Sequence, residues 1–204
     1  MNKQVIQNLP QQVQNALIAM RDYDYSLYSH SIRVGVLAGC VAEILALEDR
    51  CCNTVRIAGF VHDYGKLEIP VEVLNAPRQL TEDEQAIMRG HVLAGLYKLY
   101  LADSSFFSPS ILTAVAQHHE NLDGSGYPFG LKQISLTGKI LRVCDAFDAL
   151  THARSYKPSF NLRDSFCILK TFSGTQYDEE VIKGLENIIK DNEFAVADLC
   201  RDYF

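Results

Sequence analysis

Hydrophobic residues recur every three to four positions along most of this chain, which is the spacing of one face of an α-helix. The clearest example lies in residues 29–47, where Val34, Leu37, Val41 and Leu45 share a face. The same spacing predicts further helices over residues 9–20, 54–63, 81–100, 108–119 and 137–151, with two or three more in the C-terminal tail. The alternation typical of strands is absent, so the predicted fold class is all-α.

Local signals place the boundaries of these helices. Thr81-Glu82-Asp83-Glu84 is a capping box that begins a helix. Gly65 ends an earlier one, and the following Ile69-Pro70 step favours extended backbone. Residues 21–28 are polar and aromatic and predict a linker, whereas residues 121–130, with three glycines and a proline, predict a structured loop.

Composition narrows the class of protein. The chain has 204 residues, 48% of them hydrophobic and 22% charged, which is typical of a globular domain with its own core. Its net charge of −6 argues against binding long nucleic acid. The longest apolar stretch, residues 34–47, is too short to span a membrane and contains Glu43. The six cysteines form no Cys-x-x-Cys pair and no signal peptide precedes them, so we expect reduced thiols in the cytoplasm.

The positions of the histidines carry the chemical prediction. Five of the six fall on the inward faces of four predicted helices: His30, His62, His91, His118 and His119. Asp63 and Asp145 fall on inward faces as well. Burying so many ionisable groups without a compensating cation is costly, so we expect a divalent-metal site at the centre of the bundle. Imidazole and carboxylate ligands suit iron, manganese, cobalt or zinc, and a set this large favours two ions about 3.5–4 Å apart.

Several ordered motifs closely resemble the HD-GYP family of the HD phosphohydrolase superfamily. They are His62-Asp63 with Gly65-Lys66, His118-His119-Glu120, Asp123-Gly124-Ser125-Gly126-Tyr127-Pro128, Asp145-Ala146-Phe147-Asp148-Ala149-Leu150 and Arg154-Ser155-Tyr156-Lys157. The resemblance implies an HD-type helical bundle. It also divides the chain into an N-terminal helix and linker, residues 1–25, and an HD-GYP phosphohydrolase domain, residues 26–204.

The resemblance implies roles for individual residues. Asp63 would bridge two divalent metal ions, for which we expect iron or manganese, with other transition metals as alternatives. One ion would be held by His30, His62 and Asp145, and the other by His91, His118 and His119. Asp63 and Lys66 would be the catalytic residues. Substrate-binding roles would fall to Lys66, Gly126, Tyr127, Arg154 and Lys157.

The family consists of bacterial cyclic di-GMP phosphodiesterases, so the resemblance implies hydrolysis to linear pGpG by a hydroxide that bridges the two metal ions. A second cleavage to GMP stays open. Cyclic GMP-AMP is an alternative substrate. A monoester phosphohydrolase, or a module that binds a cyclic dinucleotide or a GGDEF domain without turnover, is an alternative activity. A GGDEF-domain or sensory protein is the implied partner.

Departures from the family pattern also produce expectations. Ser26 stands where some members have a glutamate that holds a third ion, which favours two ions here. Tyr64 and Asn121 replace a common aliphatic residue and a frequent arginine, and either change could alter the fit of the substrate. Asp148 is a candidate hydrogen-bond partner for a ligand histidine, and Glu120 is a candidate for orienting a ligand.

Overall fold

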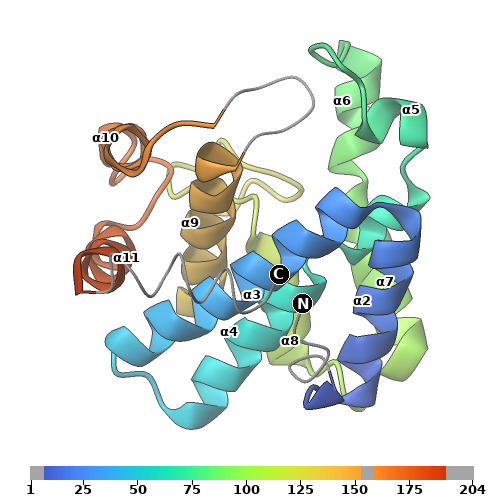
Figure 1. The fold of residues 1–204 in the computed structure, drawn as a ribbon, viewed down its shortest axis with the longest axis horizontal. Helices are drawn as coiled ribbons and strands as arrows, with labels where there is room; N and C mark the ends of the chain where they lie inside the picture. The colour runs from blue at the N-terminus through green and yellow to red at the C-terminus, as the bar shows by residue number, and fades with distance from the viewer. Residues whose placement is uncertain (1–6, 153–158, 192–204) are drawn as a thin grey trace.

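The computed structural model describes residues 7–152 and 159–191, and in these ranges the fold is helical (Figure 1). In chain order the elements are α2 (Gln11–Tyr23), α3 (Tyr25–Ile44), α4 (Asp49–Val61), the 3-10 helix η1 (Tyr64–Glu68), α5 (Val71–Leu74), α6 (Glu82–Arg89), α7 (His91–Asp103), α8 (Pro109–Gln117), α9 (Leu136–Thr151), α10 (Leu162–Thr171) and α11 (Glu179–Asp191). The described residues contain no β-sheet, only one isolated bridge between Ser173 and Tyr177. The predicted all-α class is confirmed.

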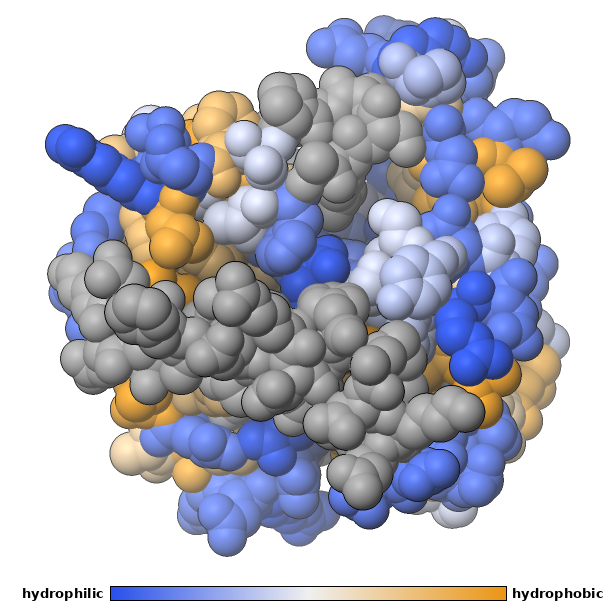
Figure 2. Space-filling model, viewed as in Figure 1, coloured by the Kyte–Doolittle hydropathy of each residue, from blue (hydrophilic) through white to orange (hydrophobic). Residues whose placement is uncertain are grey.

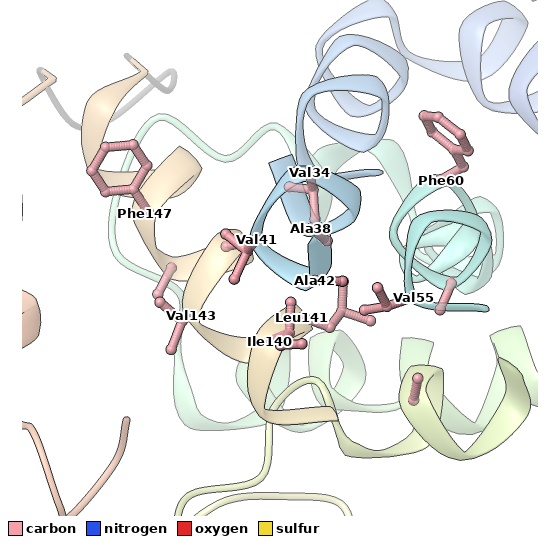
Figure 3. Packing of buried hydrophobic residues seen from close by; sticks show 14 of the residues in the cluster. Val34, Ala38, Val41, Ala42, Val55, Phe60, Ile140, Leu141, Val143 and Phe147 are labelled. Carbon is pink, nitrogen blue, oxygen red and sulfur yellow. The ribbon is translucent and has the colours of Figure 1, made fainter. Parts of the chain in front are cut away.

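Helix α3 is the central element, and it packs against α2, α4, α9 and α11. It carries a long run of buried residues because its neighbours cover most of its circumference. In Figure 3, Val34 and Val41 of α3 lie among side chains of α4 and α9, including Val55 and Leu141. His30, a predicted metal ligand, therefore lies on a helix that packs against four others.

Helices α3 and α4 approach each other closely where each has a glycine. A Cβ atom added to Gly35 would lie 2.2 Å from a ring carbon of Phe60, and one added to Gly59 would lie 2.6 Å from the Cα of Gly35. Contacts this short are not tolerated between real side chains, so both positions require glycine. The crossing brings His30 of α3 and His62, the residue after α4, within 5.2 Å between ring centroids.

The first two helices differ from the sequence prediction. Residues 21–28 are not a linker, because α2 continues to Tyr23 and α3 begins at Tyr25. Asp24 alone separates the two helices, and its carboxylate accepts a hydrogen bond from the backbone N–H of Leu27 as an N-cap. The spacing of hydrophobic residues did not reveal this N-cap, because the stretch is polar and aromatic.

The segment predicted as one helix over residues 81–100 forms two. The capping box at Thr81 is present and begins α6, but α6 ends at Arg89 and α7 begins at His91. Gly90 forms the junction and carries no side chain to hold it in either helix. The break leaves His91 at the first position of α7 rather than in the middle of a longer helix.

The outer surface carries hydrophobic residues in separate groups on the face shown in Figure 2, with hydrophilic residues over the middle of that face.

Helices α10 and α11 lie beside α9 at the edge of the bundle (Figure 1) and are separated near Ser173-Gly174, as predicted. Within the described ranges, no helix combines the length and apolar character needed to cross a bilayer.

Candidate metal centre

The seven predicted ligand side chains come together in the middle of the bundle. Six of them lie on or directly after five helices: His30 on α3, His62 after α4, His91 on α7, His118 and His119 after α8, and Asp145 on α9. The seventh, Asp63, follows His62 where α4 gives way to η1. All but His119 are less than a tenth exposed.

The ligand atoms form two groups. Atoms of Asp63, His91, His118 and His119 lie within 4.8 Å of one another, and so do atoms of His30, His62 and Asp145. These groups match the division implied by the family resemblance. Four and three protein ligands respectively suit two ions that keep coordination positions open for water or substrate.

Asp63 lies between the two groups. Its Oδ2 atom is 3.4 Å from Nε2 of His30 and 3.2 Å from Nε2 of His62. Its Oδ1 atom is 3.3 Å from Nε2 of His91 and 4.0 Å from Nε2 of His118. Because the two carboxylate oxygens face different histidines, one side chain reaches both groups.

Hydrogen bonds fix the orientation of three imidazoles. Nδ1 of His62 lies 2.8 Å from the carbonyl oxygen of Gly59, Nδ1 of His91 lies 2.6 Å from that of Met88, and Nδ1 of His118 lies 2.6 Å from that of Val115. A carbonyl oxygen only accepts, so each Nδ1 carries the proton and each Nε2 keeps its lone pair for a metal.

His30 is oriented by side chains instead. Its Nδ1 atom lies 2.6 Å from Oδ2 of Asp148, which is almost fully buried. The guanidinium of Arg33 donates two hydrogen bonds to the same carboxylate, at 2.5 and 2.9 Å. His152 follows the end of α9 and lies 3.1 Å from Asp148 at Nδ1. The predicted partner role of Asp148 is confirmed, and its ligand histidine is His30.

The buried carboxylates are held ionised. Burial alone would raise the pKa of Asp63, but the neighbouring His62 and Lys66 hold it well below its ordinary value. The pKa of Asp145 is likewise low, because the nearby imidazole of His30 outweighs the effect of burial. Two anionic side chains in the interior require nearby positive charge.

The imidazoles divide into two electrostatic types. Burial lowers the pKa of His118 and His119 well below the ordinary value, and the neighbouring histidines lower it further. Burial also disfavours charge on His30, but the carboxylates of Asp145 and Asp148 beside its ring raise its pKa to about 10. His118 and His119 are therefore poised to offer neutral nitrogen ligands.

Unpartnered atoms provide a direct test of whether a cation fits. Nε2 of His30, Nε2 of His62 and Oδ1 of Asp63 are buried and have no hydrogen-bond partner in the described part of the chain. Buried polar atoms normally have partners, and all three belong to the ligand groups. The residues present therefore fit divalent metal ions.

Lys66 lies beside the two groups. It sits on η1, and its Nζ atom donates a hydrogen bond to Oδ2 of Asp63 over 2.6 Å. Its side chain is 13% exposed and lines the cleft that opens onto His30, His91 and His119. The cleft has a volume of about 220 Å³. A cation at this position is available to an anionic ligand that enters the cleft.

The glycine-rich loop folds back on the ligand histidines. Tyr127 stacks on the imidazole of His119, with ring centroids 4.6 Å apart, and lines the cleft. A Cβ atom on Gly126 would lie 2.4–2.5 Å from backbone atoms of residues 119–121, so the loop can approach this closely only with glycine there. Buried Glu120 accepts hydrogen bonds from the backbone N–H groups of Phe129 and Leu131. Glu120 thus holds the loop.

The structure shows what surrounds the three residues that depart from the HD-GYP pattern. Asn121 accepts hydrogen bonds from Arg142 of α9 at 3.0 and 3.2 Å, so a guanidinium reaches this position from another helix. Ser26 is exposed and lines the cleft. Tyr64 lies beneath Lys98. Sequence reasoning missed Arg33 and Arg142, although a charged residue one turn after His30 on an apolar helix was a usable signal for Arg33.

Two predicted substrate-binding residues, Arg154 and Lys157, lie outside the described residues. The other predicted site residues all lie in or around the cleft: Lys66 and Tyr127 line it, and Gly126 supports Tyr127 from the neighbouring loop position.

Residues 12–181 match the family described as HD domain. Among curated relatives, the chain is 34% identical over 170 residues to cyclic di-GMP phosphodiesterase PA4108 of Pseudomonas aeruginosa, which covers 82% of the chain and 40% of the relative. It is 34% identical over 182 residues to cyclic di-GMP phosphodiesterase of Thermotoga maritima, covering 88% of the chain and 49% of the relative. It is 36% identical over 146 residues to 3'3'-cGAMP-specific phosphodiesterase 1 of Vibrio cholerae, covering 70% and 33%. The chain thus spans half or less of the length of these relatives.

Solved structures share the fold. Bd1817 of Bdellovibrio bacteriovorus, described as an HDG"Y"P protein, aligns with a TM-score of 0.64 at 21% identity, covering 79% of the chain and 51% of that structure. The HD domain of phosphodiesterase PgpH of L. monocytogenes aligns with a TM-score of 0.62 at 17% identity, covering 93% and 99%. The same domain in complex with cyclic-di-AMP aligns with a TM-score of 0.59 at 18% identity, covering 92% of each.

Proposed function

The chain belongs to the HD domain family, and on that premise we propose that it is a metal-dependent phosphodiesterase that opens cyclic di-GMP to linear pGpG. The observation that carries the proposal is the position of Asp63, whose two oxygens face separate histidine groups. Relatives over most of the chain are named cyclic di-GMP phosphodiesterases, which favours this substrate class.

We assign one ion to His30, His62 and Asp145, a second to His91, His118 and His119, and a shared role to Asp63. Iron or manganese suits this mixture of imidazole and carboxylate. Two such ions would supply an activated water and neutralise charge on the phosphoryl oxygens. The remaining chemistry falls to the side chains of the chain itself.

Lys66 is the proposed catalytic cation of the chain. Its ammonium group, which contacts Asp63, would stabilise negative charge on a phosphate oxygen and deliver a proton toward the leaving oxygen. Tyr127, held on His119 by stacking, would border the substrate, with Gly126 allowing the loop to approach. Arg154 and Lys157 would bind the second phosphate, Arg154 through two parallel hydrogen bonds.

The test is turnover by the full chain after anaerobic purification and loading with iron or manganese. Cyclic di-GMP should yield pGpG, with GMP as an optional second product, and Asp63→Asn should abolish this activity together with metal binding. A metal-loaded protein that binds cyclic di-GMP but never cleaves it would instead indicate a binding module. Cleavage of simple phosphomonoesters alone would indicate a monoester phosphohydrolase.

Cyclic GMP-AMP is the second candidate substrate. The observation in its favour is that a relative 36% identical over 146 residues is named a 3'3'-cGAMP-specific phosphodiesterase. Turnover of the two cyclic dinucleotides measured side by side on one preparation decides between them, and a higher kcat/KM for cyclic GMP-AMP would replace cyclic di-GMP as the proposed substrate.

Three further proposals concern the context of the domain. We propose a division into residues 1–25 and 26–204, a GGDEF-domain or sensory protein as the partner, and a cytoplasmic location. The last rests on the cysteines: the five in the described ranges are all free thiols, as expected in a reducing compartment.

A further inference from the structure

Apolar residues line part of the cleft beside the ligand groups, and we call this part the side arm. We define this arm by six residues: Leu27, Val73, Leu74, Ala76, Leu80 and Met88. They come from the first turn of α3, from α5 and the turn after it, and from the two ends of the segment that includes α6. Leu27, Val73 and Ala76 are buried, and the other three are partly exposed. None of the six is in the two ligand groups, and only the backbone carbonyl of Met88 contacts a ligand histidine.

One polar pair lines the same cleft. Asn75 donates a hydrogen bond from Nδ2 to Oδ2 of Asp24 over 3.0 Å, which ties the turn after α5 to the start of α3. Oδ1 of Asp24 accepts from the backbone N–H of Leu27 over 2.7 Å. Each carboxylate oxygen accepts more than one hydrogen bond, so Asp24 retains acceptor capacity toward the cleft.

We propose that the side arm binds a purine base of the dinucleotide and that Asp24 selects guanine. This inference rests on the proposed function. A purine is a flat apolar ring system with a polar edge, and the side arm offers apolar walls next to a carboxylate. The arm and the ligand groups belong to one continuous cleft, as required when a phosphate and the base attached through its ribose bind together.

The preference for guanine follows from hydrogen-bond chemistry. Guanine presents N1–H and N2–H donors on its Watson–Crick edge, and a carboxylate accepts from both. Adenine presents the N1 lone pair at the corresponding place, which a carboxylate repels. A site whose charged acceptor is left unpaired rejects the wrong base more strongly than an apolar wall does.

The first experiment compares kcat/KM for cyclic di-GMP with kcat/KM for cyclic di-AMP, using the metal-loaded full chain. We expect wild-type protein to favour cyclic di-GMP and Asp24→Asn to lower the ratio about tenfold. Asparagine is as good an N-cap as aspartate, so α3 keeps its start. Asp22→Asn, an exposed carboxylate two residues away that pairs with Arg21, is the matched control and should leave the ratio unchanged.

The second experiment tests the apolar walls. Leu80→Ala should raise KM for cyclic di-GMP several-fold with little change in kcat, and should affect bis(4-nitrophenyl) phosphate, which has no purine, much less. Equal effects of Leu80→Ala on the two substrates, or a base ratio unaltered by Asp24→Asn, would overturn the inference while leaving the proposed function standing. Wild-type protein that cleaves bis(4-nitrophenyl) phosphate but no cyclic dinucleotide would overturn the proposed function itself.

Discussion

Asp148 connects His30 to Arg33 across the interface of α3 and α9: its Oδ2 atom lies 2.6 Å from Nδ1 of His30, and its Oδ1 atom lies 2.5 Å from Nε of Arg33. The carboxylate is 3% exposed. A buried carboxylate behind a ligand histidine fixes the ring and makes its free nitrogen a better donor to a metal. Arg33 compensates the negative charge that this arrangement buries.

Replacing Asp148 should weaken metal binding before it alters the fold. Asp148→Asn keeps the size of the side chain but removes the charge, so we expect a loss of 10–100-fold, roughly, in affinity for the ion near His30. Competition titration with a chelator, followed by elemental analysis, measures this loss. His152 is a half-buried neighbour of Asp148 that lies in neither ligand group, so His152→Ala serves as the control. Equal metal affinity in both variants would contradict the positioning role.

Lys66 should separate catalysis from metal binding. Lys66→Met keeps the aliphatic stem and removes the cation, so kcat for cyclic di-GMP should fall by roughly 10²-fold or more while the metal content stays that of the wild type. Lys98→Met is the matched control, since Lys98 pairs with Glu68 on the surface and lies outside the cleft. If Lys66→Met loses metal as well, the lysine acts through Asp63 rather than on substrate.

Because the loop lies against the backbone of residues 119–121 at Gly126, adding one methyl group there should strongly affect activity and stability. Gly126→Ala would place Cβ against the backbone of residues 119–121, so the loop must move away and the stacking of Tyr127 on His119 must be lost. We expect kcat/KM to fall at least tenfold, with a drop in unfolding free energy of about 1–3 kcal/mol. Ser125→Ala, at the exposed neighbouring position, should change both quantities little. Turnover and urea unfolding measure the two effects.

The ion pair between Lys139 and Asp178 predicts a pH-dependent contribution to stability away from the metal centre. Burial would raise the pKa of Asp178, but Lys139 and two backbone N–H groups hold it below its ordinary value of 3.8. A carboxyl group with a lowered pKa in the folded state stabilises the protein above its ordinary pKa, and this stabilisation is lost as the pH falls through the lowered value.

Asp178→Asn should therefore lower the unfolding free energy at pH 6 by roughly 0.5–1 kcal/mol, a figure reduced by solvent screening of this partly exposed pair. Asparagine keeps the side-chain oxygen that caps α11, so the loss reports mainly the ion pair. The difference between wild type and variant, followed by chemical unfolding from pH 6 downward, should shrink below pH 3.8. A difference independent of pH would contradict the assignment.

The sequence was sufficient to predict most of the helices and the gathering of the histidine and aspartate side chains, because both depend on patterns within single segments. A histidine on an apolar helical face must point inward, and five such residues converge only if the fold is a bundle around them. The capping box at Thr81 is local as well, and its two hydrogen bonds are present. The division of the ligands into two groups came from the family resemblance.

Other features depend on contacts between distant segments and could not be predicted in this way. Asp148 and His30 are 118 positions apart, so the sequence offered Asp148 as a partner without saying of which histidine. The break at Gly90 was missed because the apolar spacing continues through it. Arg142 reaches Asn121 only because α9 passes beside the loop, which no local signal indicates.

The glycine pair at the crossing of α3 and α4 has a consequence for the choice of ion. Gly59 contacts His62 through its carbonyl oxygen, and the missing side chains of Gly35 and Gly59 determine how near the helices bearing His30 and His62 can come. An alanine at either position would push the two imidazoles apart and enlarge the space between them. The backbone spacing of the two helices would then determine which ionic radius is preferred. With wider spacing, a larger cation would bind more tightly and a smaller one less tightly.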